Sequence, residues 1–458
     1  MRAGRWFATV LGVTLLTAAS GAETPAPLRP IQFTDTRLSN GLRVIISEDR
    51  FAPVYAIAVS YGVGSKDERP GRTGFAHLFE HMMFKGSDNV GPGEHFFLVF
   101  NYGGSMNGTT NTDRTIYFEI MPKNQLDLGL FLESDRMRSL AITKENLDNQ
   151  RQAVQEERRQ GLDNRPYGKS QERYNELAYD NPAYHHSVIG SMEDLNAATV
   201  DDVSSFFRTY YAPNNAVVSI VGDVDAKATL AKVEKYFGNI PRQPSPAPVD
   251  LAEPEMKAER REALQDRLAR LAQINIGYKI PPAAHADFPA LTALGQILGA
   301  GESSRLYQRL VKTQELCANV GSGSAQRMGP GLFNITCTVR PGKKIEEAEA
   351  VITEEVMRLH TAPVSGDELQ RVRTNVRRQA VGTRESALAR AQALADNAVL
   401  YNDPNRINTN PDKVAAVTAG DVQRVAAKYL QTTNRVVVHT LPAAAPTGAP
   451  AGAPPAAR

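Results

Sequence analysis

The sequence predicts an α+β fold with two homologous α/β domains, each a mainly antiparallel sheet flanked by helices. A chain of 458 residues is too long for a single hydrophobic core and indicates two or three domains. Residues 241–256 are rich in proline and separate two halves of similar size, as a linker does. Four segments of the first half have counterparts in the second in the same order, which indicates duplication of one unit.

The matched segments comprise an alternating strand, an amphipathic helix, a long charged helix, and a helix followed by a strand. First half against second, they are residues 54–61 and 272–278, 73–84 and 288–298, 145–159 and 367–381, and 198–220 and 417–439. The regular spacing of parallel βαβ units is missing, which favours antiparallel sheets. We expect domains at 23–240 and 257–441, joined by the linker at 241–256.

The two ends of the chain differ from the rest. Arg2 and Arg5 precede an apolar run and small residues up to Ala22, a pattern typical of a cleaved secretory signal peptide at 1–22. A membrane anchor is the alternative, but the run is shorter than the ~20 apolar residues that span a bilayer. We therefore expect an exported, periplasmic protein without a stable membrane span, and a disordered Ala/Pro-rich tail at 442–458.

The charge balance gives no sign of a polyanionic partner. The full chain has 52 Lys and Arg against 50 Asp and Glu. Loss of Arg2 and Arg5 with the signal peptide leaves 50 of each, so the mature chain is neutral. Nucleic acids and anionic membranes are bound through excess positive charge, so neither is expected as a partner.

The two cysteines, Cys317 and Cys337, lie in apolar segments on either side of a hairpin turn predicted at 328–331. Symmetrical pairing about that turn places Cys337 opposite Val320 and not opposite Cys317. An oxidising compartment would permit a disulfide, which stays open as the alternative. We expect two buried free thiols.

Residues 77–81 read HLFEH in a segment predicted to be helical. Residues four apart lie on one helical face, so His77 and His81 can bind one metal ion together. Glu80 lies beside them and can act on water without binding the metal. H-x-x-E-H is the inverted form of a zinc-peptidase signature. Surface histidines on an ordinary helix are the alternative.

The second copy of the unit provides an internal comparison. Its matched helix has Thr292, Gly295 and Gln296 where the first has His77, Glu80 and His81. The helix is predicted in both copies, so the metal-binding side chains are not needed to build the fold. They indicate a function confined to the first copy.

A catalytic zinc ion takes three protein ligands and leaves one position for water. The helix predicted at 145–159 offers Glu156 and Glu157 as the third ligand. Their side chains point about 100° apart, so only one can face the histidines. Spacing alone does not choose between them.

Three stretches resemble the pitrilysin-type (inverzincin) zinc metallopeptidases, in the branch similar to mitochondrial processing peptidase. They are GFAHLFEHMMFKG at 74–86, GGSMNGTTNTDRTIY at 103–117 and QRQAVQEE at 150–157. The resemblance covers nearly the whole mature chain and implies a bilobed half-chamber with one Zn²⁺ per chain. It also implies the ligand set, which is His77, His81 and, 76 residues after His81, Glu157.

The resemblance further implies the chemistry and the mode of substrate binding. Zinc polarises the scissile carbonyl and lowers the pKa of water towards ~7, and Glu80 takes the proton of that water as general base. Peptides are expected to add as an extra strand within 103–117, although a plain hairpin is the alternative. The expected substrate contacts are Gly104, Ser105, Met106 and Asn107.

Three positions depart from the family pattern. Gln150 replaces a Glu that supports the metal ligands, so an amide stands in place of a charge. Val311 and Ala318 replace an Arg and a Tyr that hold substrate and stabilise the tetrahedral intermediate. The resemblance therefore implies a homologous partner chain that supplies the Arg and the Tyr in a heterodimer, with a homodimer as the alternative.

These observations predict a zinc-dependent endopeptidase that cleaves peptides or unfolded polypeptide segments, as the zinc-bearing subunit of a pair. A non-catalytic assembly or chaperone subunit with a structural zinc is the alternative from another class. The presence of Glu80 favours the endopeptidase over the non-catalytic subunit, because a structural zinc site has no use for a base beside an open ligand position. A zinc-storage protein would predict His-rich tracts, and the whole sequence has 8 His.

Overall fold

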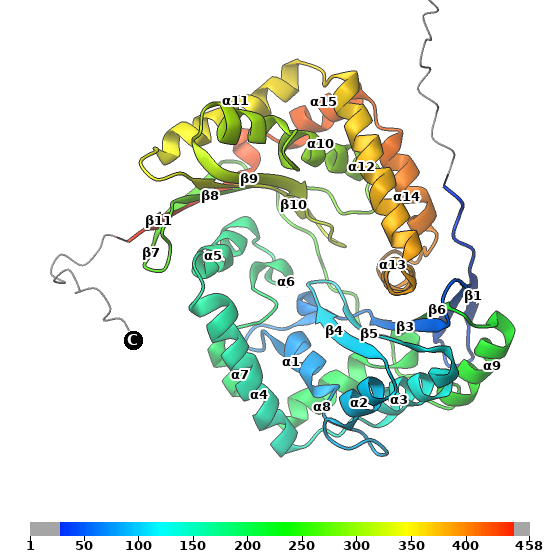
Figure 1. The fold of residues 1–458 in the computed structure, drawn as a ribbon. Helices are drawn as coiled ribbons and strands as arrows, with labels where there is room; N and C mark the ends of the chain where they lie inside the picture. The colour runs from blue at the N-terminus through cyan, green and yellow to red at the C-terminus, as the bar shows by residue number, and fades with distance from the viewer. Residues whose placement is uncertain (1–27, 444–458) are drawn as a thin grey trace, which may run out of the picture. The chain divides into compact units, whose positions relative to one another are not determined.

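The computed structural model describes residues 28–443, and its helices and strands belong to the unit that begins at Ile31. The first half (31–240) contains a six-stranded sheet ordered β1-β2-β6-β3-β5-β4 (Figure 1). The second half (257–443) contains a five-stranded sheet ordered β7-β11-β8-β10-β9. One pair in each sheet is parallel, β2 with β6 and β7 with β11, and the other pairs are antiparallel. The predicted fold class is confirmed.

The strands and helices of the first half are β1 (Thr34–Arg37), β2 (Arg43–Glu48), β3 (Val54–Tyr61), α1 (Phe75–Met82), α2 (Glu94–Asn101), β4 (Ser105–Thr110), β5 (Thr115–Pro122), α3 (Leu126–Ser139), α4 (Lys144–Arg158), α5 (Gly168–Ala178), α6 (Pro182–His185), α7 (Met192–Ala197), α8 (Val200–Tyr210), β6 (Ala216–Gly222) and α9 (Ala226–Phe237). Those of the second half are β7 (Arg260–Asp266), β8 (Gln273–Ile280), α10 (Phe288–Gly299), η5 (Tyr307–Thr313), β9 (Cys317–Ser324), β10 (Gly331–Val339), α11 (Ile345–Thr361), α12 (Gly366–Glu385), α13 (Ala387–Tyr401), α14 (Arg406–Ala415), α15 (Ala419–Tyr429) and β11 (Arg435–Pro442).

The duplication is visible in the order of the strands. The first sheet contains the series β6-β3-β5-β4 and the second contains β11-β8-β10-β9. The strands predicted at 54–61 and 272–278 are β3 and β8, and the helices that follow them are α1 and α10. The last strand of each series, β4 in the first sheet and β9 in the second, therefore lies at an edge of its sheet.

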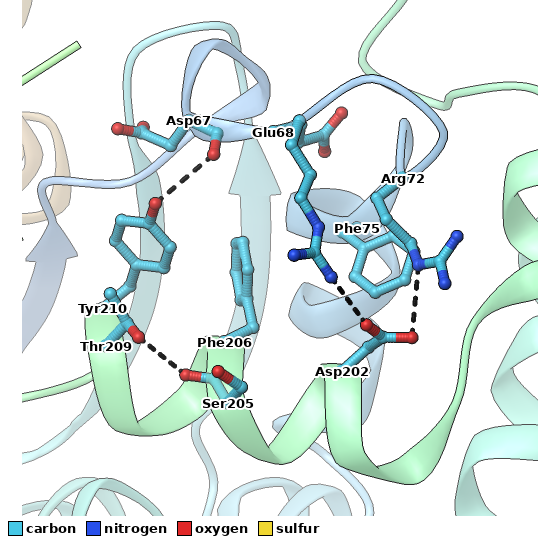
Figure 2. A pocket seen from close by; sticks show the side chains of 10 residues that line it. Asp67, Glu68, Arg72, Phe75, Asp202, Ser205, Phe206, Thr209 and Tyr210 are labelled. Carbon is cyan, nitrogen blue, oxygen red and sulfur yellow. Dashed lines mark hydrogen bonds and ion pairs between the residues drawn. The ribbon is translucent and has the colours of Figure 1, made fainter.

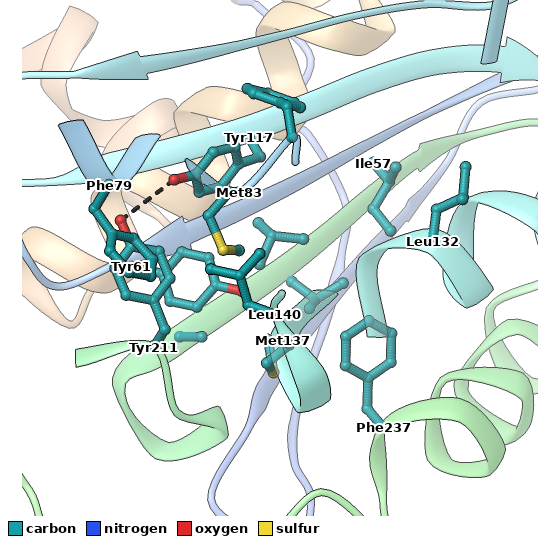
Figure 3. Packing of buried hydrophobic residues seen from close by; sticks show 14 of the residues in the cluster. Ile57, Tyr61, Phe79, Met83, Tyr117, Leu132, Met137, Leu140, Tyr211 and Phe237 are labelled. Atoms are coloured by element: carbon teal, nitrogen blue, oxygen red, sulfur yellow. Dashed lines mark hydrogen bonds between the residues drawn. The ribbon is translucent and has the colours of Figure 1, made fainter. Parts of the chain in front are cut away.

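The core of the first half determines which face of α1 is free. Leu78, Phe79 and Met82 are buried along one side of this helix, and Phe79 packs against Tyr211 with ring centroids 4.2 Å apart (Figure 3). Burial of each such side chain is worth about 1.5–3 kcal/mol. The polar residues of the H-x-x-E-H motif consequently lie on the side of α1 that faces away from this core.

Helix α13 belongs to the second half in sequence but packs on the first sheet. Its buried residues Ala391, Leu394, Ala395 and Ala398 form one cluster with apolar side chains of β2, β3, β5 and β6. The small alanine side chains let the helix lie close to the sheet. The sequence gives no sign of this crossing, because an alanine-rich amphipathic helix fits a sheet in either half equally well.

The expectation of two free thiols is wrong, because Cys317 and Cys337 form a disulfide with their Cα atoms 6.2 Å apart. The expected register is confirmed, and Cys337 pairs with Val320. A β-bulge then skips Ala318, so that Cys317 pairs with Val339. The bulge turns Cys317 onto the same face of the hairpin as Cys337, where the two side chains meet diagonally.

Several predictions concern the ends of the chain and the linker. The signal peptide at 1–22, its cleavage at Ala22 and the tail from 444 onwards lie outside the described residues, and β11 runs to Pro442. The segment 241–256 contains no helix or strand. No helix within 28–443 is long and apolar enough to cross a membrane.

We expect folded protein isolated without reductant to contain no titratable thiol. Replacing both Cys317 and Cys337 with Ser should lower the free energy of unfolding by about 3 kcal/mol, because the disulfide joins residues 20 apart in the chain. Thermal unfolding with and without reductant measures this difference, and the double variant should not respond to reductant. Two reactive thiols in the native protein would contradict the disulfide.

Candidate metal centre

Helices α1 and α4 bring three potential metal ligands together. The Nε2 atoms of His77 and His81 lie 3.5 Å and 3.4 Å from Oε2 of Glu157. The ligand atoms of the three residues lie within 4.8 Å of one another. Glu156 is directed elsewhere, since its carboxylate accepts hydrogen bonds from Arg159 and Gln160. The structure thus places Glu157, and not Glu156, beside the two histidines.

The N-terminus of α1 is fixed by a buried carboxylate. Its N-cap is Gly74, which adopts a left-handed φ of 86° and has no side chain to cap the helix. Glu68 takes that role, because its carboxylate accepts hydrogen bonds from the backbone N–H groups of Gly74 (2.8 Å) and Ala76 (2.7 Å). Complete burial raises the pKa of Glu68 well above its usual value. The pocket beside Glu68 is lined by Asp202 and by the two arginines that form ion pairs with it (Figure 2).

Helix α4 is held along its length by side-chain contacts. Its N-cap Thr143 accepts a hydrogen bond from the backbone N–H of Asn146. Arg151 donates to the carbonyl of Leu195, and Arg158 forms an ion pair with Glu172. These contacts fix the last turn of α4, from which Glu157 reaches the histidines.

Gln150, the residue expected to support the metal ligands, lies on α4 with Glu157. It is buried on α4, with 6% of its surface exposed, and its Nε2 donates a hydrogen bond to Oδ1 of Asn149. Its side chain also interacts with His81 and opposes the lowering of the pKa of that imidazole by burial, but an amide contributes no charge.

The environment keeps both imidazoles neutral. Burial and the neighbouring His81 lower the pKa of His77 to about 4. Burial also lowers the pKa of His81, against the opposing influence of Glu157. A neutral imidazole has a free lone pair, and two imidazoles with one carboxylate are a ligand set of catalytic zinc sites. The donor set therefore fits zinc.

Glu80 lies between α1 and the edge strand β4. Its Oε2 accepts a hydrogen bond of 2.5 Å from the hydroxyl of Thr110. Burial is the main cause that raises the pKa of Glu80 to about 6, and the charge of Glu157 adds to it. Gly108 of β4 lies so close that a Cβ there would be 3.1 Å from Cγ of Glu80. A carboxyl with a pKa near the working pH suits proton transfer in either direction.

The expected substrate contacts lie at the start of β4 and differ in accessibility. Ser105 and Asn107 are exposed, and Met106 packs partly against the core. Gly104 is less open, since its N–H bonds to the carbonyl of Val99 and a Cβ there would be 2.7 Å from Met121. The plain-hairpin alternative is compatible with this backbone, but β4 has a free edge.

The backbone of β4 offers hydrogen-bonding groups at that edge. The N–H of Gly108 bonds at 2.8 Å to the side-chain oxygen of Asn107. In an antiparallel strand the outward-facing N–H and C=O groups belong to alternate residues. An added strand could pair with these groups once the Asn107 side chain moves aside.

The second half carries a metal-free counterpart of the centre. Thr292 and Gln296 of α10 and Gln379 of α12 line one cavity of about 450 Å³, as the sequence match implies. The buried Oε1 of Gln296 has no hydrogen-bond partner. Amide and hydroxyl groups are poor substitutes for the imidazole and carboxylate ligands of zinc.

Two positions of the second half, 311 and 318, were expected to lack oxyanion donors. Val311 is buried in the core of the second half, and Ala318 is the exposed residue at the β9 bulge. Neither side chain has a hydrogen-bond donor. The neighbouring Lys312 is exposed, and its ammonium group lies 5.7 Å from the ring centre of Tyr307.

A second group of potential ligands, His95, Glu119 and Glu133, was not expected from the sequence. Within the described residues it is the only other such cluster, and all three side chains are buried. Burial lowers the pKa of His95 to about 3 and raises that of Glu133 to about 7. Arg136 already pairs with Glu133 and lies 4.4 Å from the ring centre of Tyr117. This cluster is a buried charge network that ties α2 and α3 to β5. The only feature of the sequence that indicates this cluster is the presence of isolated acidic residues in otherwise apolar segments.

Two family models match the chain. The one described as Insulinase (Peptidase family M16) matches residues 43–190, and the one described as Peptidase M16 inactive domain matches residues 197–376. The zinc protease PqqE of Helicobacter pylori is 31% identical over 409 residues, which cover 88% of this chain and 92% of the relative. The beta subunit of mitochondrial-processing peptidase from Lentinula edodes is 23% identical over 414 residues, covering 87% of this chain and 88% of the relative.

Solved structures show the same fold. A protease from Helicobacter pylori superposes with a TM-score of 0.86 at 30% identity, covering 90% of this chain and 100% of that chain. The periplasmic protease PqqL from Escherichia coli superposes with a TM-score of 0.74 at 19% identity, covering 91% of this chain but 48% of that chain. The resemblance found in the sequence is confirmed, and the chain belongs to peptidase family M16, the insulinase family of zinc proteases.

Proposed function

We propose that the protein is a zinc-dependent endopeptidase that cleaves peptides and unfolded polypeptide segments. One zinc ion per chain is held by His77, His81 and Glu157. The observation that carries the proposal is the position of Glu80, which adjoins this ligand set on α1 and also reaches the free edge of β4. A non-catalytic subunit with a structural zinc has no use for such a carboxylate.

The chain's own residues account for the proton transfers. When bound, zinc would polarise the scissile carbonyl and make water nucleophilic near neutral pH. Glu80 accepts the proton of the attacking water and returns it to the nitrogen of the leaving amine. Thr110 holds one oxygen of Glu80, so the other oxygen is left for this exchange.

The free edge of β4 supports binding of substrates in extended form. Main-chain pairing gives affinity that depends little on sequence, and it requires a substrate segment that is not already folded. Ser105 and Asn107 are the exposed side chains that an added strand would meet. The substrate class is therefore unfolded or flexible polypeptide.

A homologous partner chain completes the site in this proposal. Val311 and Ala318 have no donor for the developing oxyanion, and two copies of this chain would both have this deficiency. The PqqL chain, which matches this fold over 48% of its own length, supports an assembly of two such units. We propose a heterodimer in which the partner supplies an Arg and a Tyr.

The proposed location is the periplasm. The pattern at 1–22 supports export, and the disulfide between Cys317 and Cys337 requires an oxidising compartment.

Replacing Glu157 with Gln should markedly lower zinc occupancy, because a neutral amide is a much weaker ligand than a carboxylate. Metal analysis after dialysis measures this. Glu156→Gln is the matched control, since Glu156 lies on the same helix and is bonded to Arg159 and Gln160 instead. Equal zinc content in the two variants would rule out Glu157 as a ligand.

Replacing Glu80 with Gln should leave zinc bound while peptide hydrolysis falls by about 10² or more, as expected for loss of a general base. Zinc content and turnover of an unstructured peptide are measured on the same preparation. If this variant loses its metal, Glu80 is a ligand and the assigned roles are wrong.

The chain purified alone should bind zinc but hydrolyse peptides slowly. Addition of the homologous partner should raise turnover by a factor of about 10²–10³, the effect typical of one oxyanion donor. Co-purification from the native periplasm identifies the partner. Full activity of the isolated chain would refute the shared site and would require donors within this chain.

A further inference from the structure

The turn that joins β4 to β5 (residues 111–114) is held by the second half of the chain. Asp113 of this turn is buried, and its carboxylate accepts hydrogen bonds from the backbone N–H of Met328 (3.0 Å) and from the hydroxyl of Tyr184 (2.9 Å). That hydroxyl in turn accepts a hydrogen bond from the N–H of Gly329 (2.8 Å). The β9–β10 hairpin of the second half thus fixes one residue of the turn.

Arg114, the next residue of the turn, is held by helix α13. Its Nε lies 3.1 Å and 3.2 Å from the carboxylate oxygens of Asp396. Its Nη1 donates to both the carbonyl and the hydroxyl of Thr109, at 2.8 Å each. One guanidinium group therefore connects α13 of the second half with β4 of the first.

The contact between Arg114 and Thr109 lies at the end of β4 that is close to Glu80. The adjacent Thr110 donates to Glu80, and Gly108 is the residue packed against the side chain of Glu80. A small displacement of this strand end would move both the substrate edge and the partner of the general base. Misplacement by about 1 Å can cost two orders of magnitude in rate.

Asp396 is an unusual residue for its position on α13. The residues around it, including Leu394, Ala395 and Ala398, form the apolar contact with the first sheet. The carboxylate is also bonded to the hydroxyl of Ser60 on β3 (3.0 Å). Apolar packing alone would hold the helix on the sheet, and ion pairs of this kind contribute little net stability. The ion pair between Asp396 and Arg114 is better explained by the orientation that it gives to Arg114.

We propose that Asp396 is a positioning residue, which fixes Arg114 and through it the Thr109–Thr110 end of β4. The metal-free second half would in this way align the substrate strand with Glu80. The inference rests on the proposed function for its effect on peptides, but its effect on the strand is independent of that function.

The test compares Asp396→Asn with Arg390→Gln in the full, zinc-loaded chain. Arg390 also lies on α13 and also pairs across to the first half, with Asp49 at the end of β2, away from β4. Both variants remove one ion pair between α13 and the first half. Only Asp396→Asn releases Arg114.

The first measurement is hydrogen exchange of the β4 amides without any peptide. We expect exchange at residues 108–110 to become at least about tenfold faster in Asp396→Asn and to remain unchanged in Arg390→Gln. Equal exchange in the two variants would overturn the proposal, whether or not the protein proves to be a peptidase.

The second measurement is kcat and KM for an unstructured peptide with the homologous partner present, with zinc content as a check on the metal centre. We expect kcat/KM to fall about tenfold in Asp396→Asn, with zinc unchanged, and the double variant with Arg114→Gln to be no worse than Arg114→Gln alone. Additive losses in the double variant would overturn the coupling. A parent protein that cleaves no peptide even with the homologous partner present would instead refute the proposed function and leave the exchange result to decide this inference.

Discussion

The geometry of the site depends on how the short helix α1 is held. A helix of eight residues is not stable by itself, so contacts with the rest of the fold must supply its position. Phe79 and its neighbours fix one side in the aromatic core, and the carboxylate of Glu68 fixes the N-terminal N–H groups. Gly74 is required between them, because a Cβ there would come within 2.5 Å of the carbonyl oxygen of Ile189. The spacing of the two histidines is useful only because these contacts fix the direction in which they point.

Two separate elements then meet on the free side of α1. Helix α4 brings Glu157 to the histidines, and strand β4 brings Thr110 to Glu80. His77, His81 and Glu80 thus occupy one helix but depend on different neighbours. A change in α4 should act on metal binding, and a change in β4 should act on proton transfer and on substrate.

The sequence predicts this site better than it predicts its surroundings. The helical period places His77 and His81 on one face, and the duplication shows through Thr292 and Gln296 that the motif is not structural. The choice of Glu157 needed the family resemblance, because α4 offers two adjacent carboxylates. The disulfide was missed because a one-residue bulge moves a side chain to the opposite face of the sheet, and the local sequence does not predict a bulge. The packing of α13 on the first sheet was missed because periodicity identifies an apolar face but not the surface that covers it.

The two edge strands differ in regularity, and this difference supports the proposed use of β4 for peptides. β4 and β9 occupy the same place in their sheets, and either could in principle accept an added strand. The ladder of β9 is regular from Asn319 to Ser324, but the bulge at Ala318 interrupts it at the start of the strand, where Cys317 forms the disulfide. Bulges twist a strand and blunt its edge for further pairing. β4 pairs with β5 without a register shift from Ser105 to Thr110, so its edge stays regular up to the residue that holds Glu80. The regular edge and Glu80 therefore occur in the same half, and the second half is free to serve as their support.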